Sequence, residues 1–181
     1  NGDEDQAEDF IEKNWGRKLN LKERRLARDS ALSATTNVET VSARGHRFSE
    51  DIAALPIVLG NYAEVRDGKT EEFSIESFNH GSATRKVLAN FNEIGIGADL
   101  MRARDGRNIR AGKATMRGRV HKTPKSVLLV VKEKSGLAQA ARNLPGVDVV
   151  AARDLCAEDL APGGDIGRLT VFTKDAVEAL N

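Results

Sequence analysis

Residues 126–131 have the sequence SVLLVV and contain the longest strongly apolar run of the chain, Val127–Val131. A run without charged residues predicts a strand buried on both faces, as in the centre of a parallel sheet. A short helix is predicted next, near Leu137–Leu144, because Pro145 cannot continue it. The largely apolar segment Val147–Ala151 predicts a second strand. A strand, a helix and another strand in this order are typical of parallel pairing.

The same alternation continues to the end of the sequence. One or two helical turns are predicted at Asp154–Leu160, a third strand at Arg168–Phe172, and a terminal helix at Asp175–Leu180 with Thr173 as its cap. The fold class that follows is α/β, with a mainly parallel sheet and helices on both faces, a Rossmann-like three-layer arrangement. We expect a single domain over residues 15–181, preceded by an acidic, flexible segment at residues 1–14.

Asn20 begins a predicted helix in the N-terminal half. Its side chain can cap the helix, and Glu23 completes a capping-box pattern three residues later. Small apolar residues follow at helical spacing and predict a narrow packing stripe: Ala27, Ala31, Ala34 and Val38. Bases fall on another face of the same helix, where they could contact phosphate: Lys18, Lys22 and Arg25.

The pattern between residues 39 and 101 is weaker. A polar turn is predicted at Arg44–Arg47 and a short strand at Leu55–Leu59. Residues 60–82 are expected to be irregular, with turn signals at Asp67-Gly68 and His80-Gly81. A helix begins at Ala83 and ends at Gly95, with one apolar face made of Val87, Leu88, Phe91 and Ile94. A strand at Ala98–Met101 is expected to lead into a basic segment.

Charge is strongly segregated along the chain, although 28 bases and 27 acids among 181 residues leave a net charge of only +1. Residues 1–12 carry six acids and no base, residues 13–28 seven bases and one acid, and residues 102–125 nine bases and one acid. Dense basic segments on a near-neutral body are typical of a surface that binds a polyanion. A pair of solvated faces is the alternative, and for residues 13–28 alone the two interpretations are equally good.

The basic segment 102–125 is expected to be an irregular loop that binds RNA or DNA. Its bases are spaced by two to four residues and interleaved with Gly112, Gly118 and Pro124, which does not suit a regular amphipathic helix. Such a backbone can follow nucleic acid closely while arginine and lysine side chains contact phosphates. Arginine side chains can also stack on exposed RNA bases.

No catalytic, metal or cofactor site is predicted. The segment Gly95–Leu100 lacks the third glycine of a dinucleotide fingerprint, and Gly106–Lys113 has the wrong spacing for a phosphate-binding loop, so both predict turn glycines. The three histidines lie in unrelated segments. Cys156 is the only cysteine, which excludes an internal disulfide and favours a reducing compartment. We expect it to be a packed, unreactive thiol, because neighbouring acids would raise its pKa.

Four stretches together resemble one known family. They are EKNW…LNLKERRLARDSALSATT…ARGH within residues 12–46, RAGKATMRGRVHKTPKSVLLVV at 110–131, AARNLPGVDVV at 140–150 and LAPGGDIGRLTVFTKDAVEAL at 160–180. In this order they closely resemble the archaeal and eukaryotic branch of the ribosomal protein L4 family. The resemblance covers roughly residues 12–59 and 83–181, whereas residues 1–12 and 61–82 depart from it.

The resemblance implies a non-enzymatic, structural constituent of the large ribosomal subunit in the cytoplasm, which binds large-subunit ribosomal RNA and supports subunit assembly and translation. It implies neighbouring large-subunit ribosomal proteins as partners, no membrane and no small-molecule substrate. We expect the family's N-terminal strand and tunnel loop to lie outside this chain. The alternative is an α/β enzyme that binds a nucleotide at the carboxyl edge of the sheet.

The predicted RNA-binding residues combine the two basic segments with a polar turn between them. They are Lys18, Lys22, Arg24, Arg25, Arg28, Arg44, His46, Arg107, Arg110, Lys113, Arg117, Arg119, His121, Lys122 and Lys125.

Overall fold

The central strand of the sheet is β6, Leu128–Val131, and all four of its residues are buried. The computed structural model describes residues 16–50, 52, 54–60, 62–66, 69–73, 75–77 and 83–180. In it, β6 pairs in parallel with β7 (Asp148–Ala151) and β8 (Thr170–Thr173). Strand β1 (Ile57–Leu59) pairs in parallel with β8, so the order is β1-β8-β6-β7. The three predicted strands after residue 125, and their parallel arrangement, are confirmed.

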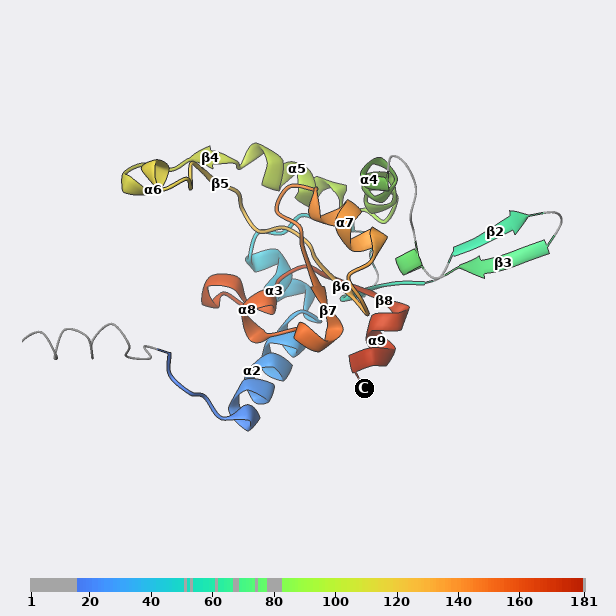
Figure 1. Cartoon of the computed structure of the whole chain (residues 1–181), viewed down its shortest axis with the longest axis horizontal. Coiled ribbons are helices and arrows are strands. Elements are labelled where there is room, and N and C mark those ends of the chain that lie inside the picture. Colours follow the sequence, from blue (N-terminus) through green and yellow to red (C-terminus); the bar gives the residue numbers. More distant parts are fainter. Residues whose placement is uncertain are drawn as a thin grey trace, which may run out of the picture.

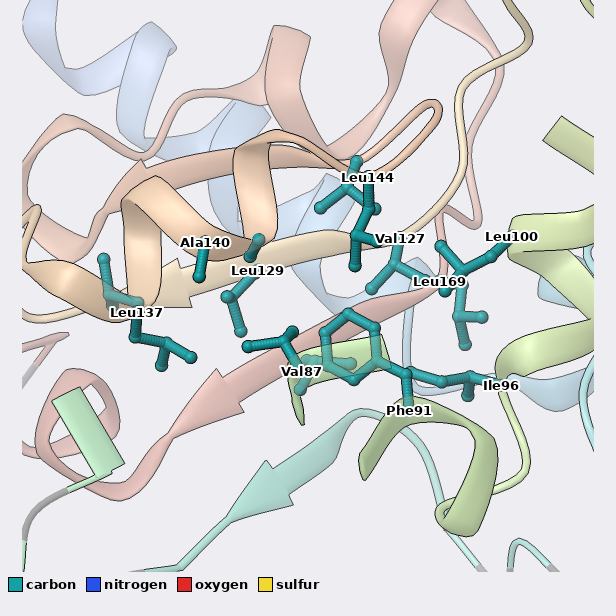
Figure 2. Close-up of a cluster of buried hydrophobic side chains, with 14 of the residues drawn as sticks. Val87, Phe91, Ile96, Leu100, Val127, Leu129, Leu137, Ala140, Leu144 and Leu169 are labelled. Carbon is teal, nitrogen blue, oxygen red and sulfur yellow. The ribbon is translucent and has the colours of Figure 1, made fainter. Parts of the chain in front are cut away.

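One face of the sheet is covered by three helices, α4 (Ala83–Glu93), α5 (Gly97–Asp105) and α7 (Gly136–Arg142). Leu129 of β6 points to this face and lies in a core that includes residues of all three helices. Figure 2 shows Phe91 of α4 in this core, with Leu129 and Leu137. Of the apolar face predicted for the helix starting at Ala83, Val87, Phe91 and Ile94 therefore pack on the sheet, whereas Leu88 is exposed.

The other face of the sheet is covered by α2 (Leu21–Ala34), α8 (Ala157–Leu160) and α9 (Lys174–Leu180). Leu128 and Val130 of β6 enter this second core, because successive side chains of a strand point to opposite faces. Helices on both faces make three layers (Figure 1), so the predicted fold class is confirmed. The remaining short elements are α3 (Val38–Ala43), η1 (Ile75–Ser77), η2 (Ala152–Asp154) and η3 (Pro162–Gly164).

The helix predicted from Asn20 to Val38 is two helices. Helix α2 ends at Ala34, where the side-chain hydroxyl of Thr35 donates to the carbonyl of Leu32 at 2.7 Å and so competes with the helical pattern. Asn37 then caps α3, since its side chain accepts the N–H of Glu39 at 2.8 Å.

The prediction of a capping box at the start of α2 is wrong, because Asn20 occupies the cap position but makes no side-chain capping bond. The predicted packing stripe of α2 is only partly confirmed, because Ala31 is buried whereas Ala27 and Val38 are exposed. At the other end of the chain the predicted cap is confirmed, because Thr173 Oγ1 accepts the N–H of Ala176 at 3.2 Å.

Two further expectations are corrected between residues 60 and 105. The strand expected at Ala98–Met101 lies inside helix α5, because Ile96, Leu100 and Ala103 bury one face at helical spacing. Residues expected to be irregular form an antiparallel pair, β2 (Tyr62–Arg66) with β3 (Lys69–Phe73). The Asp-Gly between these strands is a strong sequence signal for a hairpin, and not only for a turn.

Some expectations concern residues outside those described. They are the acidic segment 1–14 and the turns at 67–68 and 80–81. Among the helices that the structure does describe, none has the length and apolar character needed to cross a membrane.

We predict that Leu129→Ala lowers the free energy of unfolding by about 2–5 kcal/mol, because it leaves a cavity in the fully buried centre of the sheet. Leu26→Ala is the matched control: Leu26 is 73% exposed on α2, and its truncation should change stability by no more than about 0.5 kcal/mol. Urea unfolding followed by circular dichroism measures both. Equal losses in the two variants would contradict the central position of β6.

Candidate nucleic-acid interface

A hairpin rich in bases projects from the body of the molecule (Figure 1). It consists of β4 (Asn108–Ile109), α6 (Lys113–Met116) and β5 (His121–Lys122), and we call residues 107–124 the basic hairpin. In the antiparallel register, Asn108 lies opposite Lys122 and Ile109 opposite His121. Beyond these pairs, the N–H of Arg110 donates to the carbonyl of Val120 at 2.8 Å.

The charged side chains of the basic hairpin are all of one sign. No acid occurs between residues 106 and 124. Six bases are exposed: Arg107, Arg110, Lys113, Arg117, Arg119 and Lys122. Within the described part of the chain none of the six forms an ion pair, so their charge is available to an external anion.

The basic hairpin is more ordered than the irregular loop expected from its glycines. Gly112 and Gly118 bracket α6 with φ angles of +78° and +76°, which glycine adopts without strain. Between them the side-chain hydroxyl of Thr115 donates to the carbonyl of Arg110 at 2.9 Å. The glycines thus form the two turns of a compact tip, and the expectation of irregularity is wrong for the strands and for α6.

The two ends of the basic hairpin are joined to each other and to α5. At the entrance, Gly106 lies so close to Pro124 that a Cβ atom on Gly106 would be only 2.7 Å from the proline ring. At the exit, Arg102 of α5 donates from Nη2 to the carbonyl of Lys125 at 2.8 Å. Helix α5 therefore fixes where the basic hairpin leaves the body.

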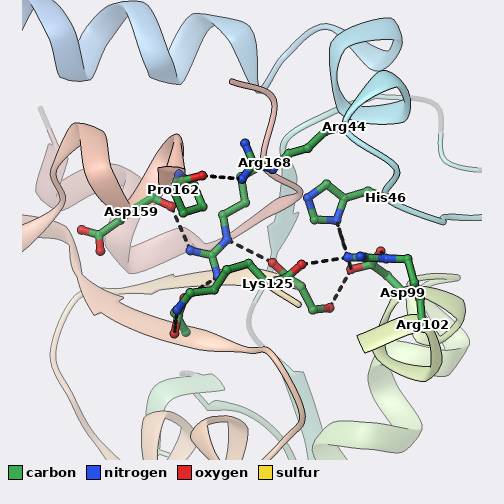
Figure 3. Close-up of polar contacts among 10 residues, drawn as sticks. Arg44, His46, Asp99, Arg102, Lys125, Asp159, Pro162 and Arg168 are labelled. Carbon is green, nitrogen blue, oxygen red and sulfur yellow. Dashed lines mark hydrogen bonds and ion pairs between the residues drawn. The ribbon is translucent and has the colours of Figure 1, made fainter. Parts of the chain in front are cut away.

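Asp99 is a fully buried carboxylate under the base of the basic hairpin, and Figure 3 shows its partners. Arg102 donates from Nε to Oδ1 at 2.8 Å, and the backbone N–H of Arg47 donates to the same oxygen at 3.0 Å. Ser126 donates from Oγ to Oδ2 at 2.6 Å, and Nδ1 of His46 lies 3.1 Å from Oδ2. We call Asp99, His46, Arg102 and Ser126 the Asp99 cluster.

Electrostatics keep Asp99 ionised. Its burial by itself would raise the pKa of the carboxyl, but the hydrogen bonds from His46, Arg102 and Ser126 outweigh that effect and hold the pKa well below its usual range. The carboxylate therefore remains a negative centre that draws α5, the segment after α3 and the start of β6 together.

A second buried charge lies on the other side of Ser126. Arg168 is 1% exposed, and its Nε donates to the carbonyl of Ser126 at 3.0 Å. Its Nη1 donates to the carbonyl of Asp159 at 2.9 Å and its Nη2 to Asp148 Oδ2 at 2.6 Å. Burial opposes ionisation of Asp148, but hydrogen bonds from Lys125 and Arg168 lower the pKa of its carboxyl. The amino ends of β6, β7 and β8 are thereby linked.

Two predicted RNA contacts are corrected by these interactions. His46 is 6% exposed and belongs to the Asp99 cluster, so its ring is not available at the surface. Arg44 is half-buried, donates to the carbonyl of Pro162 at 2.8 Å and also to that of Asp165, and so fastens the glycine-rich segment that precedes β8. Lys125 pairs with Asp148 at 2.7 Å but keeps half of its side chain exposed.

The bases at the start of α2 form a second exposed surface. Lys18 precedes the helix, and Lys22, Arg24 and Arg25 lie on its first turns, which project beyond the body. Arg28 is partly buried and pairs with the neighbouring Asp29 at 2.9 Å. Since α2 and α5 pack on opposite faces of the sheet, the two basic surfaces are not brought together.

The carboxyl edge of the sheet is occupied by an acid. Glu76 is 8% exposed, and its carboxylate accepts the N–H of Lys132 at 2.6 Å and the hydroxyl of Thr173 at 2.5 Å. In nucleotide-binding folds of this class, phosphate lies against free N–H groups at this edge. Here a carboxylate already accepts hydrogen bonds there and would repel a phosphate.

The comparison with known proteins agrees with the resemblance noted in the sequence. Residues 10–181 match the ribosomal protein L4/L1 family. The chain belongs to that family.

Individual members of the L4/L1 family cover nearly the whole chain. The protein named large ribosomal subunit protein uL4 is 44% identical over 167 residues in Halorubrum lacusprofundi, 44% over 170 in Methanocaldococcus jannaschii and 44% over 168 in Thermoplasma acidophilum. These alignments include 92%, 94% and 93% of this chain but only 60%, 61% and 59% of the relatives. The chain thus spans about three fifths of the length of these L4/L1 proteins.

The motifs for which the sequence predicted no chemistry have structural roles in this L4/L1 chain. Gly95, with φ of +93°, joins α4 to α5, so it lies between two helices rather than before a strand. Cys156 caps α8 through a capping box with Asp159, and it is exposed rather than packed as expected. Partial loss of solvent around the sulfur and the hydrogen bond to Asp159 raise the pKa of its thiol, which is the predicted direction.

We predict that Asp99→Asn lowers the free energy of unfolding by about 3 kcal/mol at pH 7, because it leaves Arg102 without its buried counter-charge. The folded-state pKa of Asp99 is depressed, so its stabilisation is complete above the unfolded carboxyl value of about 3.9 and is lost as the pH falls through the lower folded value. Between about pH 5 and pH 2.5, the variant should therefore lose less stability than the wild type.

Asp105→Asn provides the control for this pH profile. Asp105 lies on the same helix, but its ion pair with Arg104 is exposed, so the wild-type profile should be retained. Urea titrations at several pH values compare the three proteins. Identical profiles for wild type and Asp99→Asn would show that Asp99 does not hold the base of the basic hairpin.

Proposed function

We propose that this chain is an RNA-binding part of a structural protein of the large ribosomal subunit in the cytoplasm. It binds large-subunit ribosomal RNA, contacts neighbouring ribosomal proteins and supports subunit assembly and translation. Its membership of the L4/L1 family supports this proposal, as does the name of its relatives, large ribosomal subunit protein uL4.

The observation that carries the proposal is the basic hairpin. Six exposed bases without an intervening acid create a strong positive potential on a protein whose net charge is only +1. The Asp99 cluster holds the base of this hairpin in one position, so its charges form a defined array. A fixed array of bases suits the preformed phosphate backbone of a folded RNA.

The bases of α2 suggest a second RNA contact, on the other side of the sheet. Lys18, Lys22, Arg24 and Arg25 are exposed there, with Arg28 at the edge. The protein would then lie between two segments of folded RNA instead of resting on one. Lys125, beside the base of the hairpin, can extend the first contact because half of its side chain is exposed.

The enzyme alternative has less support. Glu76 accepts hydrogen bonds at the carboxyl edge, where a nucleotide phosphate would need free N–H groups. Among the described residues no cluster of three or more histidine, cysteine or acidic side chains could hold a metal ion. A non-enzymatic, RNA-binding role is therefore the better proposal.

We predict that the chain binds large-subunit ribosomal RNA with a steep salt dependence. Arg110→Gln with Arg117→Gln should reduce the slope of log affinity against log salt by about 0.7–0.9 for each phosphate that is no longer neutralised. The measurement is a filter-binding titration with overlapping transcripts of the large-subunit ribosomal RNA of a relative such as Methanocaldococcus jannaschii. Lys22→Gln with Arg25→Gln should also weaken binding, without changing hydrogen exchange in the basic hairpin.

Lys174→Gln is the control for charge alone, because Lys174 is exposed at the start of α9 and away from the basic hairpin. Its slope should equal that of the unaltered chain. Transcripts of small-subunit ribosomal RNA test for specificity at the same salt concentrations. Equal affinity for both RNAs, or a slope that the double substitution leaves unchanged, would refute the proposed function.

A further inference from the structure

The basic hairpin also exposes apolar surface, which phosphate binding does not explain. Ile109 is 72% exposed and Met116, at the end of α6, is 87% exposed. Exposed apolar surface marks a contact site when it is contiguous, so what lies beside these side chains decides their role. Their immediate neighbours in the sequence include Arg110 and Arg117, so the surface is both apolar and strongly basic.

The strand register places Ile109 beside an aromatic ring. Ile109 lies directly opposite His121, and side chains of directly opposed residues in an antiparallel pair share one face, with Cβ atoms about 4.5–5.5 Å apart. The adjacent pair, Asn108 with Lys122, points to the other face, as does Arg110 opposite Val120. One face of the hairpin thus presents an isoleucine and an imidazole side by side, both exposed.

The positive charges around the face that carries Ile109 and His121 indicate which kind of partner it binds. Arg107 and Arg119 are exposed and lie two residues before Ile109 and His121 in the sequence, just outside the two strands, so bases flank the pair. A protein partner with an apolar surface would also need acidic side chains to neutralise these arginines. RNA supplies both components, since an unpaired nucleobase is flat and apolar on its faces and is flanked by phosphates. Bases of folded RNA that are splayed out commonly stack on aromatic side chains, including histidine.

We propose that Ile109 and His121 form a stacking platform for an unpaired base of the bound RNA, with phosphates on either side held by the neighbouring arginines. This inference rests on the proposed function and adds a contact that is not electrostatic. His121 acts through the face of its ring, and Ile109 provides the apolar surface beside it. The platform reads a local RNA structure, an unstacked nucleotide, in addition to phosphate charge.

The test uses the whole chain and the large-subunit ribosomal RNA transcripts of Methanocaldococcus jannaschii, at pH 8 for every variant. His121→Ala and Ile109→Ala should each lower the affinity, about 5- to 150-fold for loss of the stacking ring. Because no counterion is released by stacking, the salt slope should stay at the wild-type value. Arg110→Gln should show the opposite signature, with a reduced slope.

His121→Phe separates stacking from hydrogen bonding, because phenylalanine keeps a flat ring but has no nitrogen. It should retain most of the affinity that His121→Ala loses. Val120→Ala is the matched apolar control on the other face of the hairpin and should bind like the wild type. Thermal unfolding of every variant should match the wild type, since Ile109 and His121 are exposed.

The outcomes distinguish the two proposals. If the unaltered chain binds none of the transcripts, the proposed function fails and the platform fails with it. If the chain binds but His121→Ala and Ile109→Ala change nothing, only the platform is overturned. If His121→Phe and His121→Ala lose affinity equally, His121 contacts RNA through its nitrogen atoms, and the stacking platform is again overturned.

Discussion

The carboxylate of Asp99 is the interaction on which the arrangement of this molecule depends. It accepts hydrogen bonds from α5, from the segment after α3 and from Ser126 at the start of β6, elements that are far apart in the sequence. Ser126 in turn accepts a hydrogen bond from the buried Arg168 at the start of β8. Hydrogen bonds between buried charged and polar groups therefore cross the amino edge of the sheet (Figure 3), and Arg102 ties the end of the basic hairpin to that edge.

This arrangement separates two uses of charge. At the edge of the sheet, Asp99 and Asp148 neutralise the bases that hold the fold together, Arg102 and Arg168 among them. In the basic hairpin no acid is present, so none of its bases is neutralised within the hairpin itself. A near-neutral chain can thereby present a strongly positive surface, because its acids lie elsewhere in the sequence and none interrupts the bases of the hairpin. Net charge alone would not have indicated this basic surface.

The sequence predicts the fold best where the physical signal is local. The uninterrupted apolar run Val127–Val131 and the strand-helix alternation after it predict the parallel sheet correctly. Helix α5 is missed because Asp99 interrupts its apolar pattern and makes it resemble a strand, while its partners His46 and Ser126 are distant in sequence. For the same reason sequence reasoning places Arg44 and His46 at the surface. The exposed bases of the hairpin are found because clustering of charge needs no tertiary information.

The Asp99 cluster places charged residues where apolar packing could give comparable stability, so its role needs a separate explanation. Replacing a buried ion pair by well-packed apolar side chains often preserves or increases stability, so the Asp99 cluster is poorly explained by stability alone. Its hydrogen bonds, however, have directions: Arg102 reaches both Asp99 and the carbonyl of Lys125. Apolar contacts would allow α5 to rotate or slide slightly, and the hairpin, projecting from the body, would amplify that movement at its tip. Directional hydrogen bonds where the hairpin joins the body therefore keep Ile109, His121 and the surrounding basic side chains in one orientation. The proposed binding to a preformed RNA surface requires such a fixed orientation.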